Sequence, residues 1–163
     1  MSDTVLEKRD RRSTDNQEII NSSRDFLTIK IENQMFGIPV LQVQDVLGSH
    51  EVASIPLAPN EVAGALNLRG RIVTAINVRK RLGLNDGADR SHQMSVVVEH
   101  KNELYSLIID EVGDVLSLSE DDYEPTPATL DEVWRIVSMG VYRLKDKLLI
   151  VLDVPKLLNT VHA

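Results

Sequence analysis

Two copies of one sequence pattern follow each other along the chain, and this repeat limits the fold more than any other feature. One stretch aligns Phe36 with Tyr105, at an offset of 69, and a later stretch aligns Gly64 with Gly140, at an offset of 76. The aligned segments are 36–48 with 105–117 and 64–83 with 140–159. The increase in offset requires a seven-residue insertion, which we place in the proline-containing segment 119–130. The repeat predicts two copies of one small structural unit.

Each copy is rich in short apolar runs that are typical of β-strands. In the segment FLTIKI, the alternate residues Leu27, Ile29 and Ile31 fall on one face. Each copy ends in a short helix, which Asn77 caps in the first copy and Asp153 in the second. Short strands without long helices favour small closed barrels, because closure removes exposed sheet edges. We therefore expect a mostly β fold of two five-stranded barrels packed together, with a short helix after each barrel's last strand.

The chain divides into a polar tail and one repeat-containing domain. Residues 1–24 are polar and of mixed charge, which predicts a disordered N-terminal tail, and the domain occupies residues 25–163. Its expected parts are subdomain 1 at about 30–84, subdomain 2 at about 92–154 and a C-terminal helix at about 154–160. We interpret the basic cluster Arg9, Arg11 and Arg12 as part of a solvated arm, with contact to a partner as the alternative.

The composition excludes several classes of function. The net charge is −7 and the basic residues are scattered, which argues against binding to nucleic acid, because that needs a concentrated basic face. The chain has no cysteine, so disulfides and thiolate metal sites are excluded. No apolar run approaches the length of a membrane span and no signal-peptide core is present. We expect a cytoplasmic protein that does not insert into a membrane.

No motif of an enzyme or a cofactor site is present in the sequence. None of the four histidines has a second candidate ligand at close spacing, and the run SEDDYE lacks the alternating ligands and central glycine of a calcium loop. Phosphate loops, nucleophile elbows and HExxH motifs are missing as well. We expect no cofactor and no metal. A catalytic pair that only folding assembles leaves no local motif, so an enzyme stays as the third hypothesis.

Val43 and Arg69 are the candidates for contact with a partner. Val43 and Asp45 are predicted to face the same way on a strand, and Val43 belongs either to the core or to an interface. Arg69 lies at a turn in which Gly70 takes the positive φ. It is a solvated turn residue, a surface ion-pair partner of Asp45, or an interface anchor. The second copy has Lys-Asp-Lys at the matching turn, residues 145–147, so the fold itself does not require an arginine there.

Four segments of the sequence resemble the CheW-like domain of chemotaxis coupling proteins. They are FGIPVLQVQDVLG, IPLAPNEVAGALNLRGRIVTAINVRKRLG, IIDEVGDVLSL and LLIVLDVPKLLN, and the resemblance runs from about Phe26 to Leu158. The NLRG core with its flanking strands is highly specific to this domain. The resemblance implies two SH3-like five-stranded β-barrels and no catalysis.

The resemblance also implies a signalling role and partners. Proteins of this family couple transmembrane chemoreceptors to a CheA-type histidine kinase within receptor arrays. They bind the regulatory domain of the kinase and the cytoplasmic tip of the receptors. By this resemblance we expect a cytoplasmic adaptor that is monomeric when free and is recruited to membrane receptor arrays.

Individual positions carry over from the family by the same resemblance. Its positions for kinase or receptor binding match Val43, Asp45, Gly64, Asn67, Arg69 and Gly70. Met94 matches a receptor-linked position, and the neighbouring Val96 and Val98 either line the groove or belong to the core. Asp45 stands where the family often has Glu, which shortens the reach to Arg69, and Met94 replaces a smaller branched residue. Trp134 is interpreted as a packed lid residue rather than a contact.

A different class of function remains as the alternative. An SH3-like module binds peptides or nucleic acid, and the acidic net charge weighs against nucleic acid. A peptide ligand requires an aromatic-lined groove, and only 4% of this chain is aromatic. The adaptor hypothesis is therefore the leading one.

Overall fold

The fold is built from short strands in the order that the repeat predicts. The structure, a computed structural model, describes residues 23–49, 52–85 and 93–159. The first repeat contains β1 (Ser23–Ile31), β2 (Gln34–Pro39), η1 (Val40–Gln42), β3 (Val43–Leu47), β4 (Val62–Leu68), β5 (Arg71–Asn77) and α2 (Val78–Arg81). The second contains β6 (Met94–His100), β7 (Glu103–Ile109), β8 (Glu111–Ser119), η3 (Glu120–Asp122), β9 (Tyr123–Glu124), α3 (Glu132–Ile136), β10 (Ser138–Arg143), β11 (Leu148–Leu152) and α4 (Val154–Leu157).

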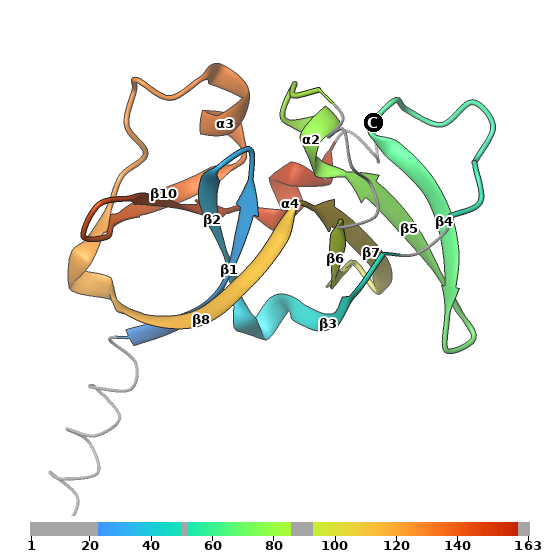
Figure 1. The fold of residues 1–163 in the computed structure, drawn as a ribbon, viewed down its shortest axis with the longest axis horizontal. Coiled ribbons are helices and arrows are strands. Elements are labelled where there is room, and N and C mark those ends of the chain that lie inside the picture. Colours follow the sequence, from blue (N-terminus) through green and yellow to red (C-terminus); the bar gives the residue numbers. More distant parts are fainter. Residues whose placement is uncertain (1–22, 50–51, 86–92, 160–163) are drawn as a thin grey trace, which may run out of the picture.

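Each of the two sheets combines strands from both repeats (Figure 1). The six-stranded sheet has the order β8-β1-β2-β11-β10-β9, and the five-stranded sheet has the order β3-β6-β7-β5-β4. Each repeat thus gives its first two strands to one sheet and its remaining strands to the other, which are three in the first repeat and four in the second. The predicted mostly β fold of two packed barrels is confirmed. The predicted division into 30–84 and 92–154 does not coincide with the sheets, because β2 pairs in parallel with β11 and β7 with β5.

Strand pairing repeats in the two sheets with the offsets found in the sequence. The β4–β5 register shifts between Val62 and Gly64, and the β10–β11 register shifts between Ser138 and Gly140, which are 76 residues further along. The predicted insertion also has a structural counterpart. It contains η3 and β9, and β9 is the extra strand that makes one sheet six-stranded. The inserted segment therefore extends the sheet.

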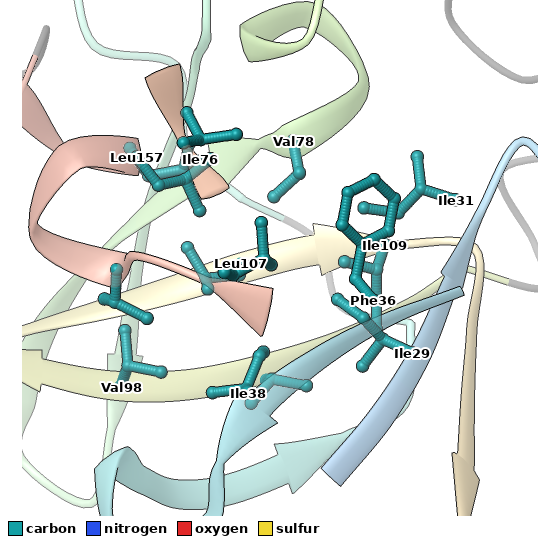
Figure 2. Packing of buried hydrophobic residues seen from close by; sticks show 14 of the residues in the cluster. Ile29, Ile31, Phe36, Ile38, Ile76, Val78, Val98, Leu107, Ile109 and Leu157 are labelled. Atoms are coloured by element: carbon teal, nitrogen blue, oxygen red, sulfur yellow. The ribbon is translucent and has the colours of Figure 1, made fainter. Parts of the chain in front are cut away.

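The buried side chains form three clusters, and the largest of them holds the two sheets together. The largest, the shared core, lies between the sheets and joins residues of both, as Figure 2 shows for Ile29, Phe36, Ile76 and Leu107. Each sheet also has a small cluster of its own. One contains Phe26 and Tyr142 of the six-stranded sheet, and the other contains Val73, Val97 and Leu104 of the five-stranded sheet. Burial of apolar surface stabilises a fold by about 25 cal/mol per Å². The shared core therefore holds the two sheets together as one folded unit.

Both repeats end in the capped helix that the sequence predicts. The Asn77 Oδ1 atom accepts a hydrogen bond from the Lys80 amide at 3.2 Å, and the Asp153 Oδ1 atom accepts one from the Lys156 amide at 3.1 Å. Gly83 follows α2 with a φ of 76°, a left-handed conformation that suits glycine at this position. The predicted caps are confirmed, and they end each repeat's last strand at the same point.

Removing either cap is expected to destabilise the fold measurably. Asn77→Ala and Asp153→Ala should each lower the free energy of unfolding by about 1 kcal/mol, because an amide of the first helical turn loses its acceptor. Urea denaturation measures the effect. The matched control Asn77→Asp keeps the acceptor and should stay near the wild-type midpoint. Unchanged midpoints in both alanine variants would contradict the capping role.

A short helix precedes β10. Helix α3 occupies Glu132–Ile136, and β10 begins only at Ser138. The helical turn brings Val133 and Trp134 onto the shared core. The Trp134 ring meets the Phe36 ring edge-on at a centroid distance of 5.6 Å, and its Nε1 atom donates to the Leu82 carbonyl at 3.4 Å. The interpretation of Trp134 as a packed lid residue is therefore confirmed.

An ion cluster around Arg79 joins the two sheets at one end of the shared core. Arg79 of α2 donates two hydrogen bonds of 2.6 Å to Asp110, which lies between β7 and β8. It donates another of 2.6 Å to Glu32 in the β1–β2 turn. The Arg79 side chain is only 14% exposed. Such a bidentate, largely buried pair fixes geometry more firmly than an exposed ion pair does.

Candidate partner-binding site

The candidate site is centred on the tip of the β4–β5 hairpin, at the end of the five-stranded sheet (Figure 1). Leu68 pairs with Arg71, so the turn contains only Arg69 and Gly70, with φ angles of 52° and 85°. Positive φ at both positions is the two-residue turn that matches the twist of a hairpin. The Asn67 Oδ1 atom accepts a hydrogen bond from the Gly70 amide at 2.9 Å and holds the turn closed.

Arg69 occupies a backbone conformation that disfavours its side chain. The predicted positive φ of Gly70 is confirmed, but Arg69 also takes one, which costs about 1–2 kcal/mol for a residue with a Cβ atom. The Arg69 side chain is 82% exposed, so packing inside the fold does not offset this cost. Glu32 and Lys101 take the same positive φ in the two other two-residue hairpin turns, so the turn itself accounts for the backbone conformation of Arg69.

Arg69 also forms the predicted ion pair with Asp45. Its Nη2 atom lies 3.2 Å from the Asp45 Oδ2 atom. The contact is electrostatic rather than a directed hydrogen bond, since Oδ2 has no hydrogen-bond donor among the described residues. Asp45 belongs to β3 and Arg69 follows β4, and these strands are the two edges of the five-stranded sheet. The pair therefore links the sheet's open edges, and its stabilising effect of about 0–1 kcal/mol leaves the guanidinium available to a partner.

Val43 and Asp45 do not face the same way, contrary to the sequence prediction. Val43 is opposite Val98, which belongs to the shared core, whereas Asp45 is opposite Val97, which belongs to the cluster of the five-stranded sheet. Side chains directly opposite each other share a face. The register of β3 and β6 shifts between Val43 and Asp45, and a bulge at Gln44 separates the two faces. Val43 is half-buried against the shared core and keeps part of its surface.

Three other predicted site residues lie inside the fold. Val96 and Val98 have no exposed surface and belong to the shared core, so the core alternative is correct and a groove-lining role is not. Gly64 is also buried, and a Cβ atom there would lie 2.3 Å from the Ala53 carbonyl oxygen. Its glycine is needed for the close approach of residue 53. Met94 is half-buried at the start of β6.

The structure adds an exposed residue that the sequence prediction missed. Ile72 is 77% exposed and lies opposite Asn67, beside the hairpin tip. The segment Ile72–Ile76 reads as one apolar run, but its alternate residues face different ways. Val73 and Ala75 are buried, and of the opposite set only Ile76 reaches the shared core. Strand periodicity places Ile72 on the same face as the buried Ile76, so the sequence pattern alone does not identify Ile72 as exposed.

The hairpin tip presents polar, charged and apolar side chains together at the surface. Asn67, Arg69, Gly70 and Ile72 are exposed there, with the half-buried Asp45 behind Arg69. Among the described residues, no three metal-binding side chains gather in one place. Within the same residues, no helix has the length and apolar character to cross a bilayer. An exposed arginine next to an apolar side chain is typical of a protein–protein interface.

Comparisons with known proteins identify the family of the chain. The family model described as CheW-like domain matches residues 25–162. The chain is 24% identical to the chemotaxis protein CheW of Rhizobium meliloti over 84% of this chain and 88% of that protein. It is 28% identical to the chemotaxis protein CheW of Klebsiella aerogenes, over 84% of this chain and 82% of that protein.

A solved structure extends the likeness to three dimensions. It is the scaffolding protein TtCheW from Thermoanaerobacter tengcongensis, with a TM-score of 0.72 and 25% identity. The match covers 80% of this chain and 88% of that one. The family model alone covers most of the sequence and includes both sheets. The chain therefore belongs to the CheW-like domain family of chemotaxis proteins.

Proposed function

We propose that this protein is a non-catalytic chemotaxis adaptor that couples transmembrane chemoreceptors to a CheA-type histidine kinase. The observation that carries the proposal is the hairpin tip, where the 82% exposed Arg69 side chain lies near the exposed Ile72. The fold does not need an arginine at this position, so a partner is the simplest reason for it. Family membership supports chemotaxis signalling as the setting.

The partners follow from the same proposal. The hairpin tip, with Asp45, Asn67, Arg69 and Gly70, binds the regulatory domain of the kinase. Met94 is proposed to contact the cytoplasmic tip of the receptors, and Val43 contributes the part of its surface that β3 leaves exposed. The adaptor is cytoplasmic and monomeric when free, and it joins the membrane receptor arrays through these two contacts.

Charge reversal at the hairpin tip tests this proposal. Arg69→Glu should weaken binding to the cognate kinase by about 30-fold or more, because a central interface arginine contributes about 2 kcal/mol or more. It also puts two like charges together at the Asp45 carboxylate. Titration calorimetry with the purified kinase regulatory domain measures the dissociation constant.

A matched control separates the hairpin tip from the overall charge. Arg135→Glu reverses another exposed arginine, on α3 of the six-stranded sheet's barrel, and should leave kinase binding within about two-fold. Circular dichroism checks that both variants remain folded. If Arg69→Glu binds as tightly as the wild type, the hairpin tip is not the kinase-binding surface.

A peptide-binding module is the second candidate function, and one observation favours it. Three of the chain's few aromatic residues, Phe26, Tyr123 and Tyr142, line one hollow on the six-stranded sheet. Selective binding of an unrelated peptide there, with the kinase ignored, would support this candidate over the adaptor.

A further inference from the structure

The six-stranded sheet has an open hollow at one end, which we name the end groove. Its inner part has a volume of about 290 Å³ and is lined by Phe26, Tyr123 and Tyr142. Its outer part has a volume of about 600 Å³ and is lined by residues that include Ser23 and Leu41. The two parts share Arg24, Pro39 and Met139 and are therefore continuous.

The repeat supplies an internal comparison for this groove. The corresponding place on the five-stranded sheet is lined by Gln93, Ser95, Leu66 and Ile108, which are the counterparts of Arg24, Phe26, Tyr142 and Pro39. Its volume is only about 30 Å³. The end groove is thus not a general result of the fold. It is specific to the six-stranded sheet, which contains the seven-residue insertion.

The insertion builds one wall of the groove. Tyr123 of β9 donates a hydrogen bond to the Met139 carbonyl, and its ring lies over Gly140, where a Cβ atom would be 2.2 Å away. The Tyr123 and Tyr142 rings meet edge-on at 5.4 Å, and Tyr142 lies 5.5 Å from Phe26. Phe26 and Tyr142 are buried, so these contacts hold the Tyr123 ring, which is 39% exposed, as a rigid aromatic surface that can receive an apolar side chain.

The rim of the groove combines exposed apolar surface with acidic charge. Leu41 is 96% exposed and Met139 is 46% exposed. The three residues Glu120–Asp122 form η3 at the rim, and all three are exposed. Arg24 forms a 2.8 Å ion pair with Glu120, so it balances only one of these charges. An occupant that fits this rim has an apolar part followed by several basic residues.

The chain itself contains such a segment within reach. Its first 22 residues lie outside the described part and join it at Ser23, which lines the groove. They include VLEKRDRR, in which Val5 and Leu6 precede Lys8, Arg9, Arg11 and Arg12. An extended chain spans about 3.3–3.6 Å per residue. The seventeen residues from Leu6 to Ser23 are therefore long enough for Leu6 to fold back onto the groove. Tethering of this kind gives an effective concentration in the millimolar range, which makes a weak contact sufficient.

We propose that residues 5–12 bind the end groove of their own chain. Val5 and Leu6 cover the aromatic surface beside Leu41 and Met139, and the arginines pair with the acids of η3. This assigns a role to the tail's basic cluster, which the hairpin-tip site does not use. A partner that needs the end groove must displace the segment, so the tail competes with that partner.

A spin label on the tail of the full-length protein tests the proposal. The chain has no cysteine, so Thr4→Cys gives a single attachment site for a nitroxide. The label should attenuate the methyl NMR signals of Leu41 and Met139 several-fold more than those of Leu57 and Ile72 on the other barrel. Raising the salt concentration should reduce the difference, because the arginine–acid pairs are solvent-exposed.

Matched tail variants, each carrying the same label, decide the assignment. Val5→Ser with Leu6→Ser, and separately a triple Arg9→Glu, Arg11→Glu and Arg12→Glu variant, should restore the Leu41 and Met139 signals. Ile19→Ser with Ile20→Ser should leave the attenuation unchanged. Equal attenuation of all four methyl groups, or none, overturns the proposal. Attenuation that grows with protein concentration also overturns it, because the segment then binds a second copy.

Discussion

Replacing Gly64 with alanine is expected to lower the free energy of unfolding by about 3 kcal/mol. The new Cβ atom would lie 2.3 Å from the Ala53 carbonyl oxygen, which is a backbone atom and cannot rotate away. Ala53 exchanges two backbone hydrogen bonds of 2.8 Å with Ala65. Relief of the clash therefore breaks this bridge at the edge of the five-stranded sheet. Urea denaturation followed by circular dichroism measures the loss.

Two other glycines serve as graded controls for this substitution. Gly70 has a φ of 85° but open space around it, so Gly70→Ala should cost about 1 kcal/mol from backbone strain alone. Gly48 has open space and no positive φ, so Gly48→Ala should change stability by less than about 0.5 kcal/mol. If all three variants lose similar stability, close packing at Gly64 is not the cause.

Loss of Arg79 is the second large effect that we expect. Arg79→Met keeps most of the side-chain volume but leaves the Asp110 carboxylate, 24% exposed, without its bidentate partner. Removing one member of a largely buried ion pair costs about 3 kcal/mol. Arg79→Lys keeps the positive charge but cannot form the bidentate contact, so its loss of unfolding free energy should be smaller than that of Arg79→Met. The exposed Arg69→Met is the matched control, with an expected loss of at most about 1 kcal/mol.

The effect of Arg79 also depends on pH in a defined direction. Burial alone raises the pKa of Asp110, but hydrogen bonds from Arg79 and the Glu32 amide outweigh it and hold the pKa below its ordinary value of 3.8. A carboxylate with a lowered folded pKa stabilises the fold above the unfolded pKa, and this contribution is lost as the pH falls through the folded value. The stability difference between wild type and Arg79→Met should therefore be full at pH 7 and shrink below about pH 4. A difference that stays constant from pH 7 to pH 3 would exclude Asp110 as the partner responsible.

Local features of this fold could be predicted from the sequence because short segments determine them. The caps at Asn77 and Asp153, the turn at Gly70 and the place of the insertion all depend on residues within a few positions of one another. The ion pair of Arg69 with Asp45 was one of three open alternatives, and the structure contains it. These features also define most of the candidate site.

The pairing of distant strands could not be predicted in the same way. A repeat is equally compatible with two self-contained barrels and with barrels that exchange strands, because the apolar pattern of β2 is the same in either case. A bulge turns Val43 and Asp45 to different faces of the sheet. The order of apolar and polar residues in β3 does not indicate this bulge. The Arg79 cluster joins Glu32 and Asp110, residues far apart in the chain, and charge alone does not identify such partners.

The exchange of strands between repeats has a consequence for the order in which the protein can fold during synthesis. The β1–β2 hairpin leaves the ribosome early, but its parallel neighbour is β11, where Phe36 pairs with Ile150 near the end of the chain. Strands whose partners are distant in the sequence pair late in folding, because a long loop must close first. The five-stranded sheet needs only strands up to β7, so it can be completed while β8–β11 are still being made. We expect the five-stranded sheet to form first. The β1–β2 hairpin and strands β8–β11 then assemble against it.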